Sequence, residues 1–75
     1  MTVIVYTKPG CPSCEQVKAY LRGRNVQFDE MVLGYDVTRE QLLEVVPGAK
    51  TVPQVLIDGL AVGGYESTVQ FLTEG

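Results

Sequence analysis

Residues 7–14 of the 75-residue chain read TKPGCPSC and contain both of its cysteines, Cys11 and Cys14, at C-x-x-C spacing. The run before them, residues 3–6 (VIVY), is continuous and mostly β-branched, which predicts a buried strand. Beyond the cysteines, apolar residues recur at helical spacing as far as Leu21, which predicts a helix. We therefore expect the two thiols where a strand gives way to a helix, and redox chemistry is the first hypothesis.

The predicted helix makes the two sulfurs chemically unequal. Pro12 suits the first helical position, where a missing N–H costs nothing, so Cys11 should lie at or beside the N-cap and Cys14 one turn in. At the N-cap, the helix dipole and the nearby ammonium of Lys8 both favour the thiolate. Cys14 shares the core-facing stripe with Val17, where desolvation favours the thiol. We expect Cys11 to attack and Cys14 to resolve.

Two other roles for the cysteine pair compete with redox cycling. A structural disulfide across two intervening residues would close a very small loop and would remove little entropy from the unfolded chain. A zinc site would need more ligands, and the chain has no other cysteine and no histidine, so a closed site would need a second subunit. We therefore favour redox cycling.

Length and composition limit the remaining functions. A chain of 75 residues predicts one domain, residues 1–75, which buries little more than about 60% of its unfolded surface and has no room for a second site. The net charge of −3 argues against a nucleic-acid partner, and no run approaches the roughly 20 apolar residues of a membrane span. With no leader-like pattern at its start, the chain is expected to be a cytoplasmic monomer.

Local signals place the elements that follow the cysteines. The first helix should run from about Pro12 to Arg24, with Asn25 as a left-handed stop. Residues 27–33 predict a second strand, parallel to the first, in which a polar pair interrupts the alternation. That interruption favours an edge position in the sheet.

The second helix has the clearest start signal, because Thr38 as N-cap and Gln41 three residues later form a capping box. It should end at residues 47–48 (PG). Acidic residues gather in this middle third of the chain, and we expect them to be solvated faces of a strand and a helix: Asp29, Glu30, Asp36, Glu40 and Glu44.

The last third of the chain predicts a hairpin and a closing helix. Residues 49–57 form a short apolar strand entered through a proline, and residues 58–59 (DG) are a strong two-residue hairpin signal. The return strand is expected at residues 60–62 and the closing helix at about residues 65–71. The predicted order is β-α-β-α-β-β-α, an α/β protein.

Three separated motifs carry a resemblance to a known family: residues 6–14 (YTKPGCPSC), 51–54 (TVPQ) and 63–66 (GGYE). Over nearly its whole length the chain resembles the glutaredoxins of the thioredoxin-like superfamily, especially the compact ones of bacteria and phages. The resemblance implies a four-stranded mixed sheet flanked by three helices and a cis peptide before Pro53. It also implies a glutathione-dependent thiol–disulfide oxidoreductase with glutathione as co-substrate and no bound cofactor or metal.

The same resemblance implies a binding site for glutathione. Val52, between Thr51 and Pro53, would pair through its backbone with the cysteinyl part of the tripeptide. Lys8 and Arg39 would face its glycyl carboxylate.

The start of the closing helix would hold the other end of glutathione. Gly64 and Tyr65 would offer backbone N–H groups to the γ-glutamyl carboxylate, and Glu66 would pair with the ammonium. Glu66 stands where the family usually has Asp. Ser13, beside Cys11, replaces the Tyr of many dithiol members.

Three hypotheses remain for the physiological function and its partners. The favoured one is reduction of disulfide-containing proteins and glutathione mixed disulfides. A second is electron donation to ribonucleotide reductase, with recharging by thioredoxin reductase. A third is an iron–sulfur carrier in which two subunits bridge a [2Fe–2S] cluster through Cys11 and two glutathiones.

Overall fold

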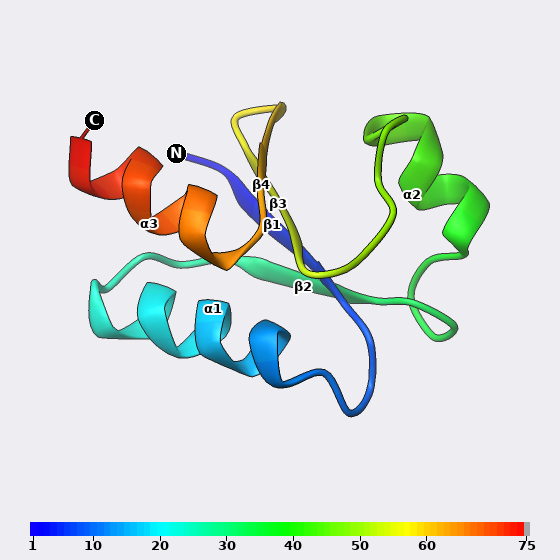
Figure 1. Cartoon of the computed structure of the whole chain (residues 1–75), viewed down its shortest axis with the longest axis horizontal. Coiled ribbons are helices and arrows are strands. Elements are labelled where there is room, and N and C mark those ends of the chain that lie inside the picture. Colours follow the sequence, from blue (N-terminus) through cyan, green and yellow to red (C-terminus); the bar gives the residue numbers. More distant parts are fainter. Residues whose placement is uncertain (75) are drawn as a thin grey trace.

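The computed structural model describes residues 1–74, and the predicted order of elements is confirmed (Figure 1). Three helices and four strands follow one another along the chain: β1 (Val3–Thr7), α1 (Pro12–Gly23), β2 (Asp29–Val32), α2 (Arg39–Val45), β3 (Gln54–Ile57), β4 (Leu60–Gly63) and α3 (Tyr65–Glu74). Together they build an α/β fold in which one mixed sheet carries helices on both faces.

The sheet has the strand order β2-β1-β3-β4, so β2 lies at an edge, as predicted. β1 runs parallel to β2 and antiparallel to β3, and β3 pairs with β4 in an antiparallel hairpin. Asp58 and Gly59 at the hairpin turn have φ values of 50° and 83°, the left-handed pair that this type of turn needs. β1 is therefore central, and its carboxyl end leads directly to the cysteines.

Two hydrophobic clusters lie on opposite faces of the sheet, because successive side chains of a strand point to opposite sides. Val5 of β1 joins the cluster beneath α1 and α3, which also contains Val17 and Leu21 of α1. Tyr6, the next residue, joins the cluster beneath α2, which contains Leu42. Figure 1 shows the same division, with α1 and α3 side by side and α2 apart from them.

All three helices begin where the sequence predicts, and the first two end slightly earlier. Thr38 and Gln41 form the expected capping box, each bonded to the backbone of the other. The second helix stops at Val45, before the expected Pro47-Gly48, because a residue that precedes proline is driven out of the helical region. Val46, at φ −131° and ψ 80°, has already left it.

The remaining element bounds also differ from the prediction. The first helix ends at Gly23, with Arg24 as its C-cap, and Asn25 takes the expected left-handed conformation at φ 58°. The closing helix continues to Glu74.

Two predicted strands are shorter than expected. Only Asp29–Val32 of residues 27–33 pairs with β1. Only Gln54–Ile57 of residues 49–57 is a strand, because the chain first turns at Ala49 and then passes through the cis peptide between Val52 and Pro53.

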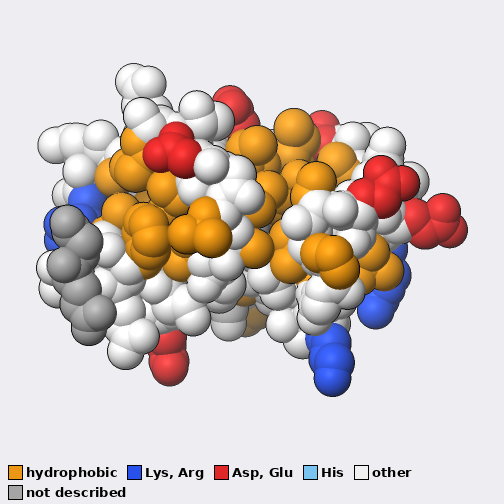
Figure 2. All heavy atoms as spheres, turned by 90° about the horizontal axis from the view of Figure 1, so that it is seen from above, with side chains coloured by type: hydrophobic (Ala, Val, Ile, Leu, Met, Phe, Trp, Pro, Cys, Tyr) orange, Lys and Arg blue, Asp and Glu red, His pale blue; other side chains and the backbone are white. Residues whose placement is uncertain are grey.

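The surface above the sheet is partly apolar. Figure 2 shows hydrophobic side chains along the face seen from above, between the α3 end and the α2 end of the molecule. Large exposed hydrophobic residues include Leu60 on β4, Phe71 on α3 and Val45 on α2. Within residues 1–74, no helix combines the length and the apolar character needed to cross a membrane.

Candidate active site at the start of the first helix

Cys11 is the N-cap of α1 and Cys14 lies in its first turn, as predicted. Pro12 occupies the first helical position, and Cys11 keeps an extended backbone at φ −104° and ψ 105°. The backbone N–H of Cys14 donates to Cys11 Sγ at 3.2 Å. The two cysteines form a disulfide with their Cα atoms 5.3 Å apart. The first sulfur therefore lies among the unpaired N–H groups that favour a negative charge.

The two cysteines differ in burial in the predicted order, although both are well covered. Cys14 is 0% exposed, while Cys11 keeps 8% of its surface accessible. Part of the cover over Cys11 comes from Val52, whose carbonyl oxygen lies 3.8 Å from Cys11 Sγ. The cis peptide before Pro53, implied by the family resemblance, is confirmed. A backbone segment from a distant part of the chain thus flanks the more accessible sulfur.

Beside this segment lies a small hollow of about 80 Å³. Its lining brings together three cations that the sequence places far apart, Lys8, Arg39 and Lys50, with Thr51 and Val52. Its apolar lining is made by Leu33, Leu42, Leu43 and Ala49. Such a lining suits a ligand with a carboxylate. Lys50 was not predicted; its position directly before the TVP motif is the signal that could have found it.

The start of α3 approaches the cis proline from the other side. A Cβ built on Gly64 would lie 3.6 Å from the carbonyl oxygen of Pro53, so a side chain at position 64 would face this backbone. Glu66 is exposed in the first turn of α3. The ring of Tyr65 packs edge-on against Tyr20 at a centroid distance of 6.2 Å.

Ser13 is exposed in the first turn of α1, next to Cys11. The predicted site residues thus come from the start of α1, the segment before β3 and the start of α3, while Lys8 and Arg39 meet at the hollow.

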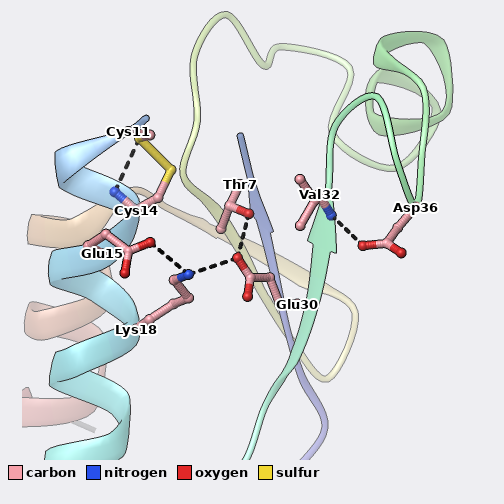
Figure 3. A network of polar contacts seen from close by, with 8 residues as sticks. All are labelled: Thr7, Cys11, Cys14, Glu15, Lys18, Glu30, Val32 and Asp36. Atoms are coloured by element: carbon pink, nitrogen blue, oxygen red, sulfur yellow. Dashed lines mark hydrogen bonds and ion pairs between the residues drawn. A yellow bond between two sulfur atoms is a disulfide. The ribbon is translucent and has the colours of Figure 1, made fainter. Parts of the chain in front are cut away.

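A network of charged groups that the sequence did not predict lies next to the cysteines (Figure 3). Lys18 of α1 donates to Glu30 of β2 at 2.9 Å and pairs with Glu15 at 2.8 Å. Thr7, the last residue of β1, donates its hydroxyl to the same Glu30 oxygen at 2.7 Å. Hydrogen bonds to Glu15 and Glu30 raise the pKa of Lys18 above its ordinary value. Hydrogen bonds from Lys18 and Thr7 hold the pKa of Glu30 below its own.

The expectation that Glu30 belongs to a solvated strand face is therefore wrong. Its side chain is only 30% exposed, because Lys18 reaches across from α1 to meet it. Lys18 itself follows Val17 on the core-facing stripe and lies one turn beyond Cys14. A lysine in that position was the signal for a buried partner, since an enclosed ammonium needs a carboxylate.

Within residues 1–74, no group of three or more His, Cys, Asp or Glu side chains is placed to hold a metal ion.

The chain is similar to known proteins over nearly its whole length. The glutaredoxin family model matches residues 3–62. The chain is 37% identical over 76 residues to glutaredoxin 1 of Rickettsia conorii, covering 99% of this chain and 74% of that protein. It is 37% identical over 70 residues to the hybrid peroxiredoxin hyPrx5 of Haemophilus influenzae, where it spans only 29% of the relative's length. Among solved structures, the buckwheat glutaredoxin–glutathione complex matches with a TM-score of 0.82 and 26% identity, over 97% of this chain and 69% of that one.

Proposed function

The chain belongs to the glutaredoxin family and is a glutathione-dependent thiol–disulfide oxidoreductase, and we propose that Cys11 is its nucleophile and Cys14 its resolving thiol. The observation that carries the division of labour is the placement of Cys11 at the N-cap of α1, with the fully buried Cys14 donating its N–H to that sulfur. An N–H donor and a helix N-terminus stabilise the thiolate, which is the attacking form of a thiol.

In the first step, the Cys11 thiolate attacks one sulfur of the substrate disulfide. A mixed disulfide forms on Cys11, and the other substrate sulfur leaves as a thiolate and takes up a proton. In the second step, Cys14 loses its proton and attacks Cys11 Sγ. The Cys11–Cys14 disulfide forms, and the rest of the substrate leaves as its second thiol.

Two molecules of glutathione return the protein to the dithiol. The first attacks the disulfide to give glutathione bound on Cys11 and a free Cys14 thiol. The second attacks the bound glutathione and leaves as glutathione disulfide, restoring the Cys11 thiolate. Each cycle therefore moves two electrons and two protons from glutathione to the substrate. A substrate that is itself a glutathione mixed disulfide can be reduced through Cys11 and glutathione alone.

Glutathione is proposed to lie across the backbone that flanks Cys11. Support comes from the Val52 carbonyl beside the sulfur, since Thr51, Val52 and Pro53 can hold an extended peptide by main-chain pairing. Lys8 and Arg39, which line the adjoining hollow, would hold the glycyl carboxylate.

At the other end, backbone N–H groups of Gly64 and Tyr65 would receive the γ-glutamyl carboxylate, and Glu66 would pair with its ammonium. Ser13 would border the tripeptide near Cys11. The buckwheat neighbour was solved as a complex with glutathione, which supports this occupant.

We propose disulfide-containing proteins of the cytoplasm as targets, with the chain acting as a single domain and a monomer. Ribonucleotide reductase is one candidate for such a target. The alternative electron source to glutathione is thioredoxin reductase. The cations of the hollow and the acid at Glu66 favour glutathione, because its two carboxylates and one ammonium match them. An alternative function for the chain is to carry a [2Fe–2S] cluster.

A coupled assay separates these functions. The purified chain is supplied with a model disulfide, NADPH and either glutathione with glutathione reductase or thioredoxin reductase alone, and NADPH oxidation is followed. Glutathione-dependent turnover supports the proposal, and turnover only with thioredoxin reductase contradicts it. A visible absorption band after anaerobic purification would favour the cluster carrier instead.

A further inference from the structure

The charged network near the cysteines connects α1, whose start carries both sulfurs, with β2 and with the end of β1. Lys18 lies four residues beyond Cys14 on the same face of α1, and Thr7 ends β1 just before the loop that leads to Cys11. Glu30 of β2 bonds to both of them through one oxygen atom. Figure 3 shows Lys18 and Glu30 meeting between α1 and the sheet, on the side of α1 toward which Cys14 also points.

The charges of this network are unequally exposed. The side chain of Lys18 is 10% exposed and that of Glu30 is 30% exposed, while Glu15 is 70% exposed and screened by water. Of the three charges, those of Lys18 and Glu30, one positive and one negative, are therefore the least screened by water. Charge matters near the cysteines because the disulfide is neutral, whereas the reduced protein carries a thiolate.

We propose that Lys18 and Glu30 are positioning residues that set the redox equilibrium of the Cys11–Cys14 pair with opposite electrostatic signs. The ammonium of Lys18 favours the reduced form with its thiolate, and the carboxylate of Glu30 opposes it. Their mutual contact, together with Thr7, holds the first turns of α1 against the end of β1. This inference rests on the proposed roles of Cys11 and Cys14.

The redox equilibrium of the Cys11–Cys14 pair is measured against glutathione and its disulfide. The Cys11–Cys14 disulfide and two glutathiones give the dithiol and one glutathione disulfide, with two electrons and two protons transferred. The protein is equilibrated with known ratios of glutathione and its disulfide at pH 7, quenched by alkylation, and the fraction of dithiol is read by mass spectrometry. This readout does not depend on turnover.

Opposite shifts are expected from the two partners of one contact. Glu30→Gln should move the equilibrium constant about threefold toward the dithiol, or about 14 mV at 29.6 mV per tenfold. Lys18→Met should move it about threefold toward the disulfide, and the double variant should return close to the wild type. A contact that only holds the fold would shift both single variants in the same direction.

Matched variants keep the test decisive. Glu44→Gln removes an equal charge from an exposed site on α2 and should leave the equilibrium unchanged. Lys18→Arg keeps the positive charge and should have the same equilibrium constant as the wild type. If Lys18→Met does not fold, Glu30→Gln decides alone: a shift toward the dithiol beyond the Glu44→Gln control supports the inference, and no shift or a shift toward the disulfide overturns it. Failure of the proposed cysteine roles would appear separately, as activity of a Cys11→Ser variant.

Discussion

Cys11 Sγ lies 3.8 Å from the carbonyl oxygen of Val52, a residue 41 positions later in the chain. The contact brings a reactive sulfur next to backbone that is not part of a strand, since β3 begins only at Gln54. An extended thiol peptide can pair with such backbone without regard to its side chains. We therefore propose that one site on this backbone takes both glutathione and protein disulfides.

The thiol of Cys11 should titrate well below a free cysteine in the reduced protein. The helix N-terminus and the N–H of Cys14 both stabilise its thiolate. Lys8→Ala should raise the pKa of Cys11 only modestly, because an exposed ammonium is screened by water and salt. Thiolate absorbance followed against pH measures both, and an unshifted Cys11 in the wild type would refute the assignment.

Glu66→Ala should raise the KM for glutathione. The exposed carboxylate would make one charge-assisted contact with the γ-glutamyl ammonium, worth about 0.5–1.5 kcal/mol. That corresponds to a rise of about three- to tenfold in KM, with kcat little changed because the contact is remote from the sulfur. Glu66→Asp is the matched control and should retain affinity. Unchanged glutathione kinetics in Glu66→Ala would leave Glu66 as a helix-start acid and favour thioredoxin reductase as the electron source.

The stability that Glu30 provides should depend on pH. Glu30→Gln removes a carboxylate that accepts two hydrogen bonds, so the free energy of unfolding at pH 7 should fall by about 1–3 kcal/mol. The pKa of Glu30 in the folded protein is below the ordinary value of 4.5, because Lys18 and Thr7 donate to the carboxylate. Its contribution is therefore complete above about pH 4.5 and is lost as the pH falls through the folded value.

Urea unfolding of the wild type and Glu30→Gln at several pH values tests this sign. The difference between the two midpoints should be largest near neutral pH and should shrink in acid. A difference that stays constant from pH 7 to acid would mean that Glu30 does not act through its charge.

The sequence was sufficient for the order of elements and for the cysteine geometry, because both follow from local signals. The N-cap role of Cys11 follows from Pro12 directly after it, and the start of α2 follows from Thr38 and Gln41. Element ends were less predictable. β3 is shorter than its apolar run because the backbone before Gln54 passes through a cis peptide instead of continuing the ladder.

The charged network could not be predicted from local pattern. Lys18 and Glu30 belong to different elements, and their contact depends on the packing of α1 against the sheet. On sequence alone Glu30 belonged to a group of acidic residues with no visible partner. The meeting of Lys8, Arg39 and Lys50 at one hollow is likewise a product of the fold.

The division of labour between the cysteines is tested most directly with Cys11→Ser and Cys14→Ser in two assays. One assay follows reduction of a glutathione mixed disulfide, and the other follows a protein disulfide that needs two thiols. Cys14→Ser should keep the first activity, lose the second and accumulate one glutathione on Cys11 by mass spectrometry, while Cys11→Ser should lose both. Retained activity in Cys11→Ser, or equal loss of both activities in Cys14→Ser, would contradict the assignment of Cys11 as nucleophile and Cys14 as resolving thiol.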